Sequence, residues 1–395
     1  MNVRLDREFT GLNSDLFFLT DGTIQKSGSA PDYIEYSGSY GINELANLLE
    51  MEPPKLISDS VRKSLQSTGI GERKISYFAD PEDFKLGLKK AQAFCEKLFT
   101  SLERPEYAER HIKNLKFLNS MRPAKIDSDK LNACEEIKNK NALESFSSDA
   151  EGFMDPVRYS LTNSITGRTS VISGPQILTT AKVVRSFLRS RYSDGIVLEI
   201  DFSSLEPRVA LAIAGVKVDY RDVYDQINAE ILGGDLSRDA AKLATLSAMY
   251  GASERSLAES LPDHVKPRKV IESIRARLGF DQAVRKLKSD MEARGRSLNY
   301  FGRPIIAPSD RNVRDAVLFN WLIQSSAVDV ALQGFRDLTT KLKRLGVDFA
   351  PIFVIHDALL IDVKREHLDT IKTVCSSGCE IDGLANFPIT VKTLG

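Results

Sequence analysis

The chain has 395 residues, of which 42% are hydrophobic and 27% are charged, as is typical of a globular protein with two or three subdomains. No run of about 20 apolar residues predicts a transmembrane helix, and the first residues lack the apolar core of a signal peptide. The four cysteines form no zinc-binding pattern. We therefore expect reduced thiols and a cytoplasmic protein, associated with the nucleoid if the source is bacterial, with no membrane partner.

The formal net charge is zero, but the charges are unevenly distributed. Residues 1–60 contain ten acidic and four basic side chains, whereas residues 236–303 contain fourteen basic and eight acidic ones. Phosphate backbones respond to local potential rather than to the total charge, so the basic stretch is compatible with nucleic-acid binding. Two solvated surfaces of opposite sign explain the same pattern.

The first 60 residues contain short strand-like pieces and no convincing chemical motif. Apolar residues at intervals of three and four predict a helix from Phe84 to Leu102, and a second helix is expected from Glu106 to Met121. Each helix has a basic face that could contact a phosphate backbone or simply be solvated. The polar residues 138–149 predict a linker or loop.

A buried strand is predicted by the apolar run Ile196–Ile200, which is broken only by Glu199. It ends at Asp201 and is followed by a helix from about Leu205 to Ala214. A strand end holds a carboxylate rigidly enough to serve as a metal ligand. The same aspartate could instead cap the helix that follows.

Two further helices are expected, the first opened by Asp222 and the second capped by Ser237. In the second helix, side chains four residues apart form one slanted stripe. Arginine and lysine in this stripe suit a triphosphate, and its terminal tyrosine could face a base. Surface charge and core packing explain the stripe without a ligand. The stripe consists of Arg238, Lys242, Leu246 and Tyr250.

After basic helical sequence that ends at Arg296, residues 299–304 predict a strand–turn–strand, followed by a helix pair, Asn312–Ser325 and Ala327–Leu345. This pair carries Asn320 and Gln324 one turn apart, where amides could read a minor groove or belong to an ordinary surface.

The run Ile352–Val363 predicts a β-hairpin with His356 and Asp357 at its tip. A carboxylate in this apolar setting costs free energy unless it is paired or used, although a solvated turn aspartate is the alternative. A helix near Lys364–Val374 and a strand at Ile389–Lys392 are expected to follow.

Two strand-borne aspartates, Asp201 and Asp357, with Arg238 and Lys242 between them in the sequence fit two-metal phosphoryl transfer. In this chemistry Arg238 and Lys242 would neutralise charge that develops on a pyrophosphate leaving group.

The same stretches resemble the family A DNA polymerases of the bacterial DNA polymerase I type. Residues 201–208 (DFSSLEPR) are similar to the first palm motif, DYSQIELR, and residues 238–251 to the fingers pattern R-x3-K-x3-aromatic-x3-Y-G. Residues 355–358 (IHDA) are similar to VHDE, residues 166–170 (TGRTS) to TGRLS, and residues 320–329 (NWLIQSSAVD) to N-x3-Q-G-T-A-A-D. The five motifs occur in the order of the family and span about residues 155–365.

The resemblance implies a mixed α+β fold with right-hand polymerase architecture. An antiparallel sheet would form the palm, and the fingers and thumb would be helical. The implied ranges are an N-terminal segment of unknown role (1–60), the thumb (61–145), the palm (146–215 and 310–395) and the fingers (216–309).

The resemblance also implies a role for each site residue. Asp201, Asp357 and the backbone carbonyl of Phe202 would bind two Mg²⁺ ions, for which Mn²⁺ can substitute, and Lys242 would assist catalysis. Glu206 would be the steric gate that rejects a ribose 2′-hydroxyl. The nucleotide would be bound by Arg238, Lys242, Leu246, Tyr250, Glu206 and Tyr224, and the primer–template DNA by Arg168, Asn320, Gln324 and His356.

Some positions depart from the family pattern. Leu246 replaces an aromatic residue, and Ala358 replaces an acidic residue beside the catalytic aspartate. Because Asp201 and Asp357 are retained, we still expect activity. We expect no intrinsic proofreading, since residues 1–60 are too few for a 3′–5′ exonuclease domain and their D-x-E sequence at Asp6 lacks an apolar strand. This acidic segment could dock a separate exonuclease or another replication protein, or could extend the thumb.

The sequence therefore predicts a DNA-templated DNA polymerase that extends a primer 3′-hydroxyl with dNTPs, in a short, phage-like form. A single-subunit RNA polymerase is one alternative, against which Glu206 argues because a steric gate favours deoxynucleotides. A catalytically weakened homologue that only binds DNA is the other, and Ala358 and Leu246 are the residues that support it.

Overall fold

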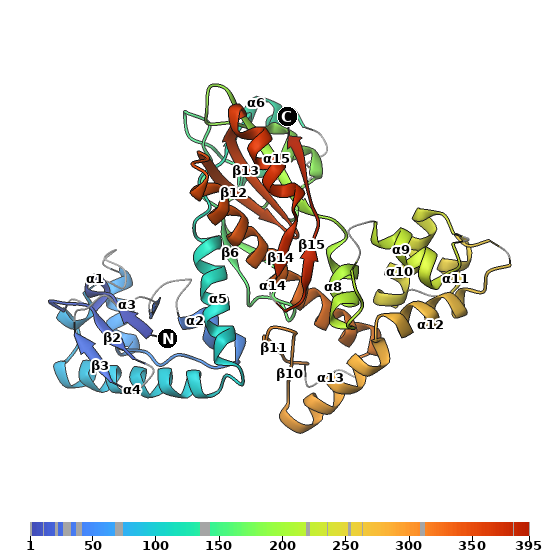
Figure 1. The fold of residues 1–395 in the computed structure, drawn as a ribbon. Coiled ribbons are helices and arrows are strands. Elements are labelled where there is room, and N and C mark those ends of the chain that lie inside the picture. The colour runs from blue at the N-terminus through green and yellow to red at the C-terminus, as the bar shows by residue number, and fades with distance from the viewer. Residues whose placement is uncertain are drawn as a thin grey trace. The chain divides into compact units, whose positions relative to one another are not determined.

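The computed structural model describes residues 2–10, 12–19, 23–26, 33–36, 42–67, 74–134, 143–218, 222–234, 236–251, 254–262, 264–308, 313–381 and 383–394. The chain forms two compact units, Met1–Leu115 and Lys116–Gly395, called unit 1 and unit 2 below. Figure 1 gives the order of their helices and strands.

Unit 1 contains a small four-stranded sheet with the strand order β3-β2-β1-β4. The central strand β1 pairs antiparallel with β2 and parallel with β4. The strands are β1 (Asn2–Leu5), β2 (Leu16–Phe18), β3 (Ile24–Lys26) and β4 (Tyr33–Glu35), and the helices are α1 (Arg7–Thr10), α2 (Ile42–Leu48), α3 (Asp59–Ser67), the 3₁₀ turn η1 (Ile75–Tyr77), α4 (Pro81–Thr100) and α5 (Pro105–Leu118).

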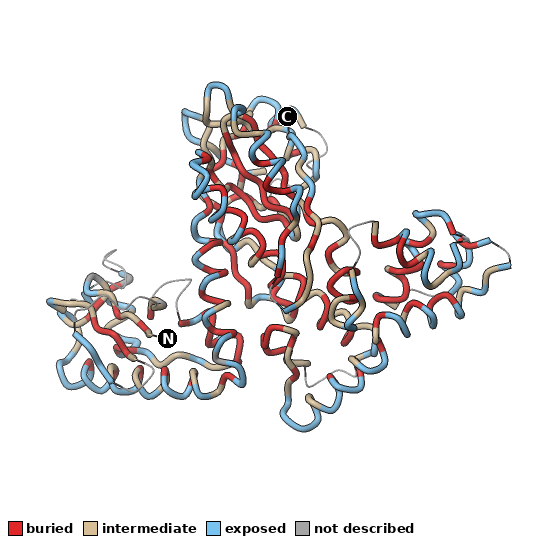
Figure 2. Tube along the Cα trace, viewed as in Figure 1, coloured by how far each residue is buried: buried red, intermediate tan, exposed pale blue. Residues whose placement is uncertain are grey.

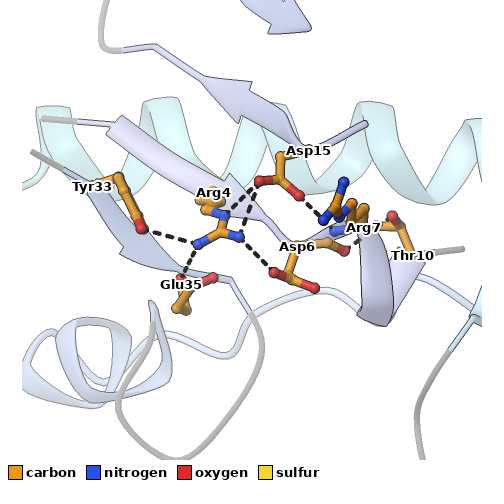
Figure 3. A network of polar contacts seen from close by, with 7 residues as sticks. All are labelled: Arg4, Asp6, Arg7, Thr10, Asp15, Tyr33 and Glu35. Atoms are coloured by element: carbon orange, nitrogen blue, oxygen red, sulfur yellow. Dashed lines mark hydrogen bonds and ion pairs between the residues drawn. The ribbon is translucent and has the colours of Figure 1, made fainter. Parts of the chain in front are cut away.

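One arginine links the strands of this sheet through acidic neighbours. The guanidinium of Arg4 on β1 contacts the carboxylates of Asp6 at 2.7 Å and Asp15 at 3.0 Å, and that of Glu35 on β4 at 3.3 Å. It also donates to the hydroxyl of Tyr33, as Figure 3 shows. Because Asp6 is held in this network, the first acid of the D-x-E sequence has a structural partner.

The two long helices expected in this region are confirmed as α4 and α5. Asp80 caps α4 by accepting a hydrogen bond from the backbone N–H of Glu82 at 2.9 Å. Helix α4 lies so close to the backbone of Leu56 that only a glycine fits at Gly87, where a Cβ would collide with the Leu56 carbonyl.

Unit 2 is organised around an antiparallel four-stranded sheet with the order β12-β13-β9-β16. Three of its four strands are mostly buried, as Figure 2 shows, whereas the edge strand β16 is largely exposed or half-buried. The predicted strand, hairpin and last strand are all confirmed, as β9 (Gly195–Phe202), β12 (Phe349–Ile355), β13 (Ala358–Lys364) and β16 (Ile389–Leu394). The sheet places residues from three distant parts of the sequence side by side.

A second group of helices in unit 2 carries the basic residues. Helices α9, α11 and α12 pack around α10, and α13 follows α12 (Figure 1). Asp222 and Ser237 cap α9 and α10 as predicted, because their side chains accept from the backbone N–H groups of Tyr224 and Ala240. The bounds are α8 (Leu205–Ile213), α9 (Val223–Ile231), α10 (Arg238–Tyr250), α11 (Glu254–Ala258), α12 (Pro267–Arg277) and α13 (Phe280–Arg294).

The predicted helix pair at 312–345 is wrong, because one continuous helix, α14 (Asp315–Arg344), spans this part of the chain. Ser325 and Ser326 do not break the helix because their hydroxyls have partners. Ser326 Oγ donates to the carbonyl of Leu322 one turn earlier, and Ser325 Oγ accepts from Asn299. Asn312, the predicted start, lies outside the described residues.

Short elements complete unit 2. They are β5 (Lys125–Ile126), α6 (Ser128–Asn132), β6 (Arg158–Ser160), β7 (Ser170–Ser173), η2 (Lys182–Phe187), β8 (Leu188–Arg189), β10 (Ser297–Leu298), β11 (Pro304–Ile305), η3 (Arg365–His367), α15 (Leu368–Ser376), β14 (Cys379–Ile381) and β15 (Ala385–Phe387). A loop is predicted at 138–149, and its residues 138–142 lie outside the described residues. No helix in the described part of the chain is long and apolar enough to cross a membrane.

Candidate active site

Of the two predicted metal-binding aspartates, Asp201 lies on β9 and Asp357 lies at the tip of the adjacent β12–β13 hairpin. Asp201 on β9 is paired with Ala358 on β13. Asp357, the residue before Ala358, therefore lies at the same end of the sheet as Asp201. The backbone N–H of Phe202 donates to the carbonyl of Asp357 at 3.1 Å, which ties the two strands together beside the carboxylates. Residues 156 positions apart in the sequence are thus brought together at one end of the sheet.

The carboxylates of Asp201 and Asp357 are partly buried and lie close to other negative charges. Burial, the charge of Asp357 and that of Glu199 raise the pKa of Asp201 to about 6. Burial also raises the pKa of Asp357, against the opposing effects of a backbone hydrogen bond and of His356 and Arg168. Two carboxylates that each disfavour the other's charge are stabilised when a cation binds between them.

The donor atoms available at Asp201, Asp357 and the carbonyl of Phe202 are oxygens, which hard divalent cations such as Mg²⁺ accept. Among the described residues there is no group of three or more His, Cys, Asp or Glu side chains that could hold a metal ion. Mg²⁺ is usually bound by one or two carboxylates with water and substrate phosphates in the remaining positions. Asp201, Asp357 and the carbonyl of Phe202 therefore suit Mg²⁺, provided that a substrate supplies further oxygens.

Backbone strain marks both turns beside the aspartates. His356 and Ser204 adopt left-handed conformations with φ of 55° and 52°, which are uncommon for residues other than glycine. Ser204 immediately precedes α8, so this turn joins β9 to the helix that carries Glu206. Burial and the charge of Arg168 lower the pKa of His356, so it is neutral over a wider pH range than a free histidine.

A cavity of about 280 Å³ lies beside Asp357 and gathers most of the predicted site residues. They come from the turn before β7, from helices α8, α9, α10 and α14, and from the hairpin tip. The predicted residues that line it are Arg168, Glu206, Tyr224, Leu246, Tyr250, Gln324, His356 and Asp357. Asp201, Phe202, Arg238, Lys242 and Asn320 are not part of the lining.

Glu206 stands at the centre of the polar contacts in this cavity. Its Oε1 accepts from Arg168 Nη2 at 2.5 Å, and its Oε2 accepts from the hydroxyl of Tyr250. Burial raises the pKa of Glu206, and the charge of Arg168 opposes the increase. Sequence reasoning assigned roles to all three residues but did not foresee that they contact one another.

The stripe on α10 divides into two parts. Leu246 and Tyr250 line the cavity and are not core residues, since Tyr250 is 38% exposed. Arg238 and Lys242 are exposed, and their charged groups lie 5.7 Å and 6.0 Å from the ring centroid of Tyr224. Tyr224 therefore connects the cationic half of the stripe with the cavity.

One residue of this site was noticed in the sequence only as a helix cap. Asp222 Oδ2 accepts from both Nε and Nη2 of Arg238, at 3.0 Å and 2.6 Å. Burial disfavours its charge, but the hydrogen bonds from Arg238 and from the backbone of Tyr224 leave the pKa of Asp222 below its usual range. The pairing joins the start of α9 to the start of α10.

The two amides on α14 differ in their surroundings. Gln324 lines the cavity. Asn320 lies one turn earlier, and its buried Oδ1 has no hydrogen-bond partner among the described residues. A buried amide oxygen without a partner costs free energy, which a ligand that donates a hydrogen bond would recover.

Comparisons with known proteins identify the family and the fold of the chain. The sequence profile of DNA polymerase family A matches residues 141–393. A curated DNA polymerase I from Caldicellulosiruptor bescii is 24% identical over 227 residues, which are 50% of this chain and 26% of the relative, so the chain spans about a quarter of its length.

The fold is similar to that of a solved structure, the POL domain of Pol1 from M. smegmatis in complex with DNA primer-template and dNTP. The TM-score is 0.56 at 13% sequence identity, and the match covers 96% of this chain and 92% of the other. This similarity confirms the α+β class and the right-hand architecture. Since the family profile covers well over half of the chain, the protein belongs to DNA polymerase family A.

Proposed function

We propose that this protein extends the 3′-hydroxyl of a DNA primer with deoxynucleoside triphosphates on a DNA template, by two-metal nucleotidyl transfer. The observation that carries the proposal is the placement of Asp201 and Asp357 at the same end of the sheet, beside a cavity that contains Glu206 and Tyr250. Bound Mg²⁺ would supply the positive charge that activates the primer hydroxyl and stabilises the leaving pyrophosphate.

The residues around the cavity would bind different parts of the incoming nucleotide. Arg238 and Lys242 are exposed at the cationic end of α10, where they would bind the triphosphate. Tyr250 and Leu246 would contact the base and sugar of the incoming nucleotide. Glu206, held by Arg168 and Tyr250, would occupy the space that a 2′-hydroxyl needs.

The DNA would lie against the other side of the cavity. Arg168, Gln324 and His356 line this side and would contact the primer–template minor groove and the primer end, with Asn320 one turn along α14. The thumb, palm and fingers ranges stay predictions, as does a docking role for the acidic residues 1–60.

Primer extension on a defined template tests the proposal, with each dNTP, rNTP and dideoxynucleotide added separately. We expect extension with dNTPs that is lost in Asp201→Asn and Asp357→Asn. Asp194→Asn is the matched control, because Asp194 precedes β9 at its other end and is 82% exposed in its pair with Arg365. Extension that survives in both site variants would refute the metal assignment.

The sugar preference is tested in the same assay. Glu206→Ala should reduce the preference for dNTPs over rNTPs, as a ratio of kcat/KM values, by at least about tenfold. Efficient use of rNTPs by the unmodified protein would instead favour an RNA polymerase. A 3′-labelled primer incubated without nucleotides should stay intact, whereas its degradation would contradict the expectation that the chain has no proofreading activity.

A further inference from the structure

A buried arginine outside the cavity has no role in the site described so far. Arg303 lies in the turn between β10 and β11, and it is only 3% exposed. A buried guanidinium costs several kcal/mol unless its donors are used. The contacts of Arg303 therefore indicate which part of the fold it stabilises.

Arg303 bridges the two ends of the loop that precedes Arg168. Its Nη2 donates to the carbonyl of Leu161 at 2.6 Å. At the other end, the guanidinium lies against Gly167, where a Cβ would be 2.5 Å from Cζ and 2.7 Å from Nη1. Gly167 has φ of +70°, so glycine is required here both by the backbone conformation and by the approach of the arginine.

The turn that carries Arg303 is itself anchored to α14 by Asn299. Its Oδ1 accepts from the backbone N–H groups of Phe301 at 2.9 Å and Arg303 at 2.8 Å. Its Nδ2 donates to Ser325 Oγ at 3.0 Å and to Asp329 Oδ2 at 2.7 Å. Asn299, Ser325 and Asp329 are all buried, which makes the anchor insensitive to solvent.

The hydrogen bonds of Arg303 and Asn299 connect to residues that line the cavity. Arg168 follows Gly167 directly, and its guanidinium reaches Glu206. At the other end of the network, Ser325 follows Gln324, which lines the same cavity. The buried polar contacts thus join two residues that would touch the primer–template, although they are separated by more than 150 positions in the sequence.

We propose that Arg303 is a positioning residue for Arg168. It holds the loop from Leu161 to Gly167 against the turn anchored on α14, so that Arg168 is kept in the orientation that contacts Glu206 and the DNA. The inference rests on the proposed function, since it names how one DNA-binding residue of that site is oriented. Arg303 itself does not line the cavity.

A double-mutant cycle tests the proposal in the full chain. Arg303→Lys keeps the charge but cannot contact Leu161 and Gly167 with one planar group. We expect it to lower kcat/KM for primer extension about tenfold and to weaken duplex binding, because misplacing a contact by an ångström has effects of this size or larger. In the Arg168→Ala background, Arg303→Lys should have less than a twofold further effect.

A matched control separates positioning from general loss of stability. Arg191 makes comparable contacts, with Nε to Asp362 at 3.0 Å and Nη2 to the carbonyl of Pro123. In the described part of the chain, neither of these hydrogen bonds involves the loop before Arg168. Arg191→Lys should lower the free energy of unfolding, and any loss of activity should combine additively with Arg168→Ala. Gly167→Ala, which displaces the same guanidinium from the other side, should reproduce the effect of Arg303→Lys.

Fluorescence anisotropy with a labelled primer–template separates failure of this inference from failure of the proposed function. If the protein binds the duplex and the variants are coupled, but no primer is extended, the inference stands and the proposed activity fails. If primers are extended but the effects of Arg303→Lys and Arg168→Ala multiply, Arg303 does not act through Arg168. Absence of duplex binding by the unmodified protein would overturn both.

Discussion

Gly334→Ala is expected to displace the ring of Phe202 and to weaken metal binding at the adjoining carbonyl. Gly334 lies in α14, against the sheet face that carries Phe202. A Cβ at this position would be 2.7 Å from Phe202 Cζ and 3.2 Å from Cys379 Sγ. The ring must therefore move by about 0.7 Å to reach an ordinary carbon–carbon contact. The ring of Phe335, whose centroid is 5.4 Å from that of Phe202, limits the directions in which it can move.

The size of the effect follows from two opposing contributions. Alanine is more favourable than glycine in a helix interior by about 1 kcal/mol. Overpacking a well-filled core costs about 1–3 kcal/mol, so the free energy of unfolding should fall by up to about 2 kcal/mol. The displaced ring belongs to the residue whose carbonyl is the proposed ligand, so we expect the Mg²⁺ concentration for half-maximal extension to rise severalfold.

Urea unfolding and Mg²⁺ titrations of primer extension measure the two effects. The control is Phe202→Leu, which removes the ring atom that would collide and keeps the backbone carbonyl. In this background Gly334→Ala should be neutral or stabilising and should leave the Mg²⁺ requirement unchanged. If Gly334→Ala alone raises the free energy of unfolding by the full helix-propensity gain of about 1 kcal/mol, the reasoning is refuted.

Four further predictions concern charge and packing. Asp222→Asn should lower the KM for dNTPs about two- to fivefold, because the carboxylate that competes with the triphosphate for Arg238 is lost. Asparagine caps α9 nearly as well as aspartate, so the helix should be preserved. A higher KM in steady-state kinetics would show that Asp222 instead orients Arg238. Since the pKa of Asp201 is raised to about 6, extension at limiting Mg²⁺ should fall as the pH decreases below about 6, and added Mg²⁺ should restore it. In the metal-free protein the same carboxyl holds its proton more tightly when folded, so its contribution to stability should decrease as the pH rises from 3.8 to about 6, as thermal melts at several pH values can check. Gly87→Ala should destabilise unit 1 by up to about 2 kcal/mol, because its methyl group would meet the backbone carbonyl of Leu56, which cannot rotate away, and alanine recovers only about 1 kcal/mol of helix propensity. A higher melting temperature would contradict the close approach of α4.

Sequence patterns predicted the elements whose signals are local. The apolar run of β9, the hairpin around Asp357 and the caps Asp222 and Ser237 each depend on residues within one element or beside it. These elements place the two aspartates and the α10 stripe, so much of the candidate site could be inferred before its geometry was known.

The features that the sequence did not predict depend on contacts between residues far apart in the chain. The continuity of α14 could not be predicted because Ser325 has its partner in Asn299, 26 positions earlier. The contact between Arg168 and Glu206 spans 38 positions, and the one between Leu161 and Arg303 spans 142. No local periodicity encodes such pairs, so single side chains such as Arg303 appear in the sequence only as members of a basic stretch.

The sheet order of unit 2 also has a consequence for biosynthesis. Strand β9 pairs with β13 and β16, and the contact of Asp201 with Thr390 joins residues 189 positions apart. At about 5–20 residues per second, a ribosome needs about 10–40 s to synthesise this stretch. During that time helices α9 to α13 can form from nearby residues, whereas both edges of the apolar strand β9 lack their partners. The yield of folded protein should therefore depend on chaperones and on translation speed through this interval.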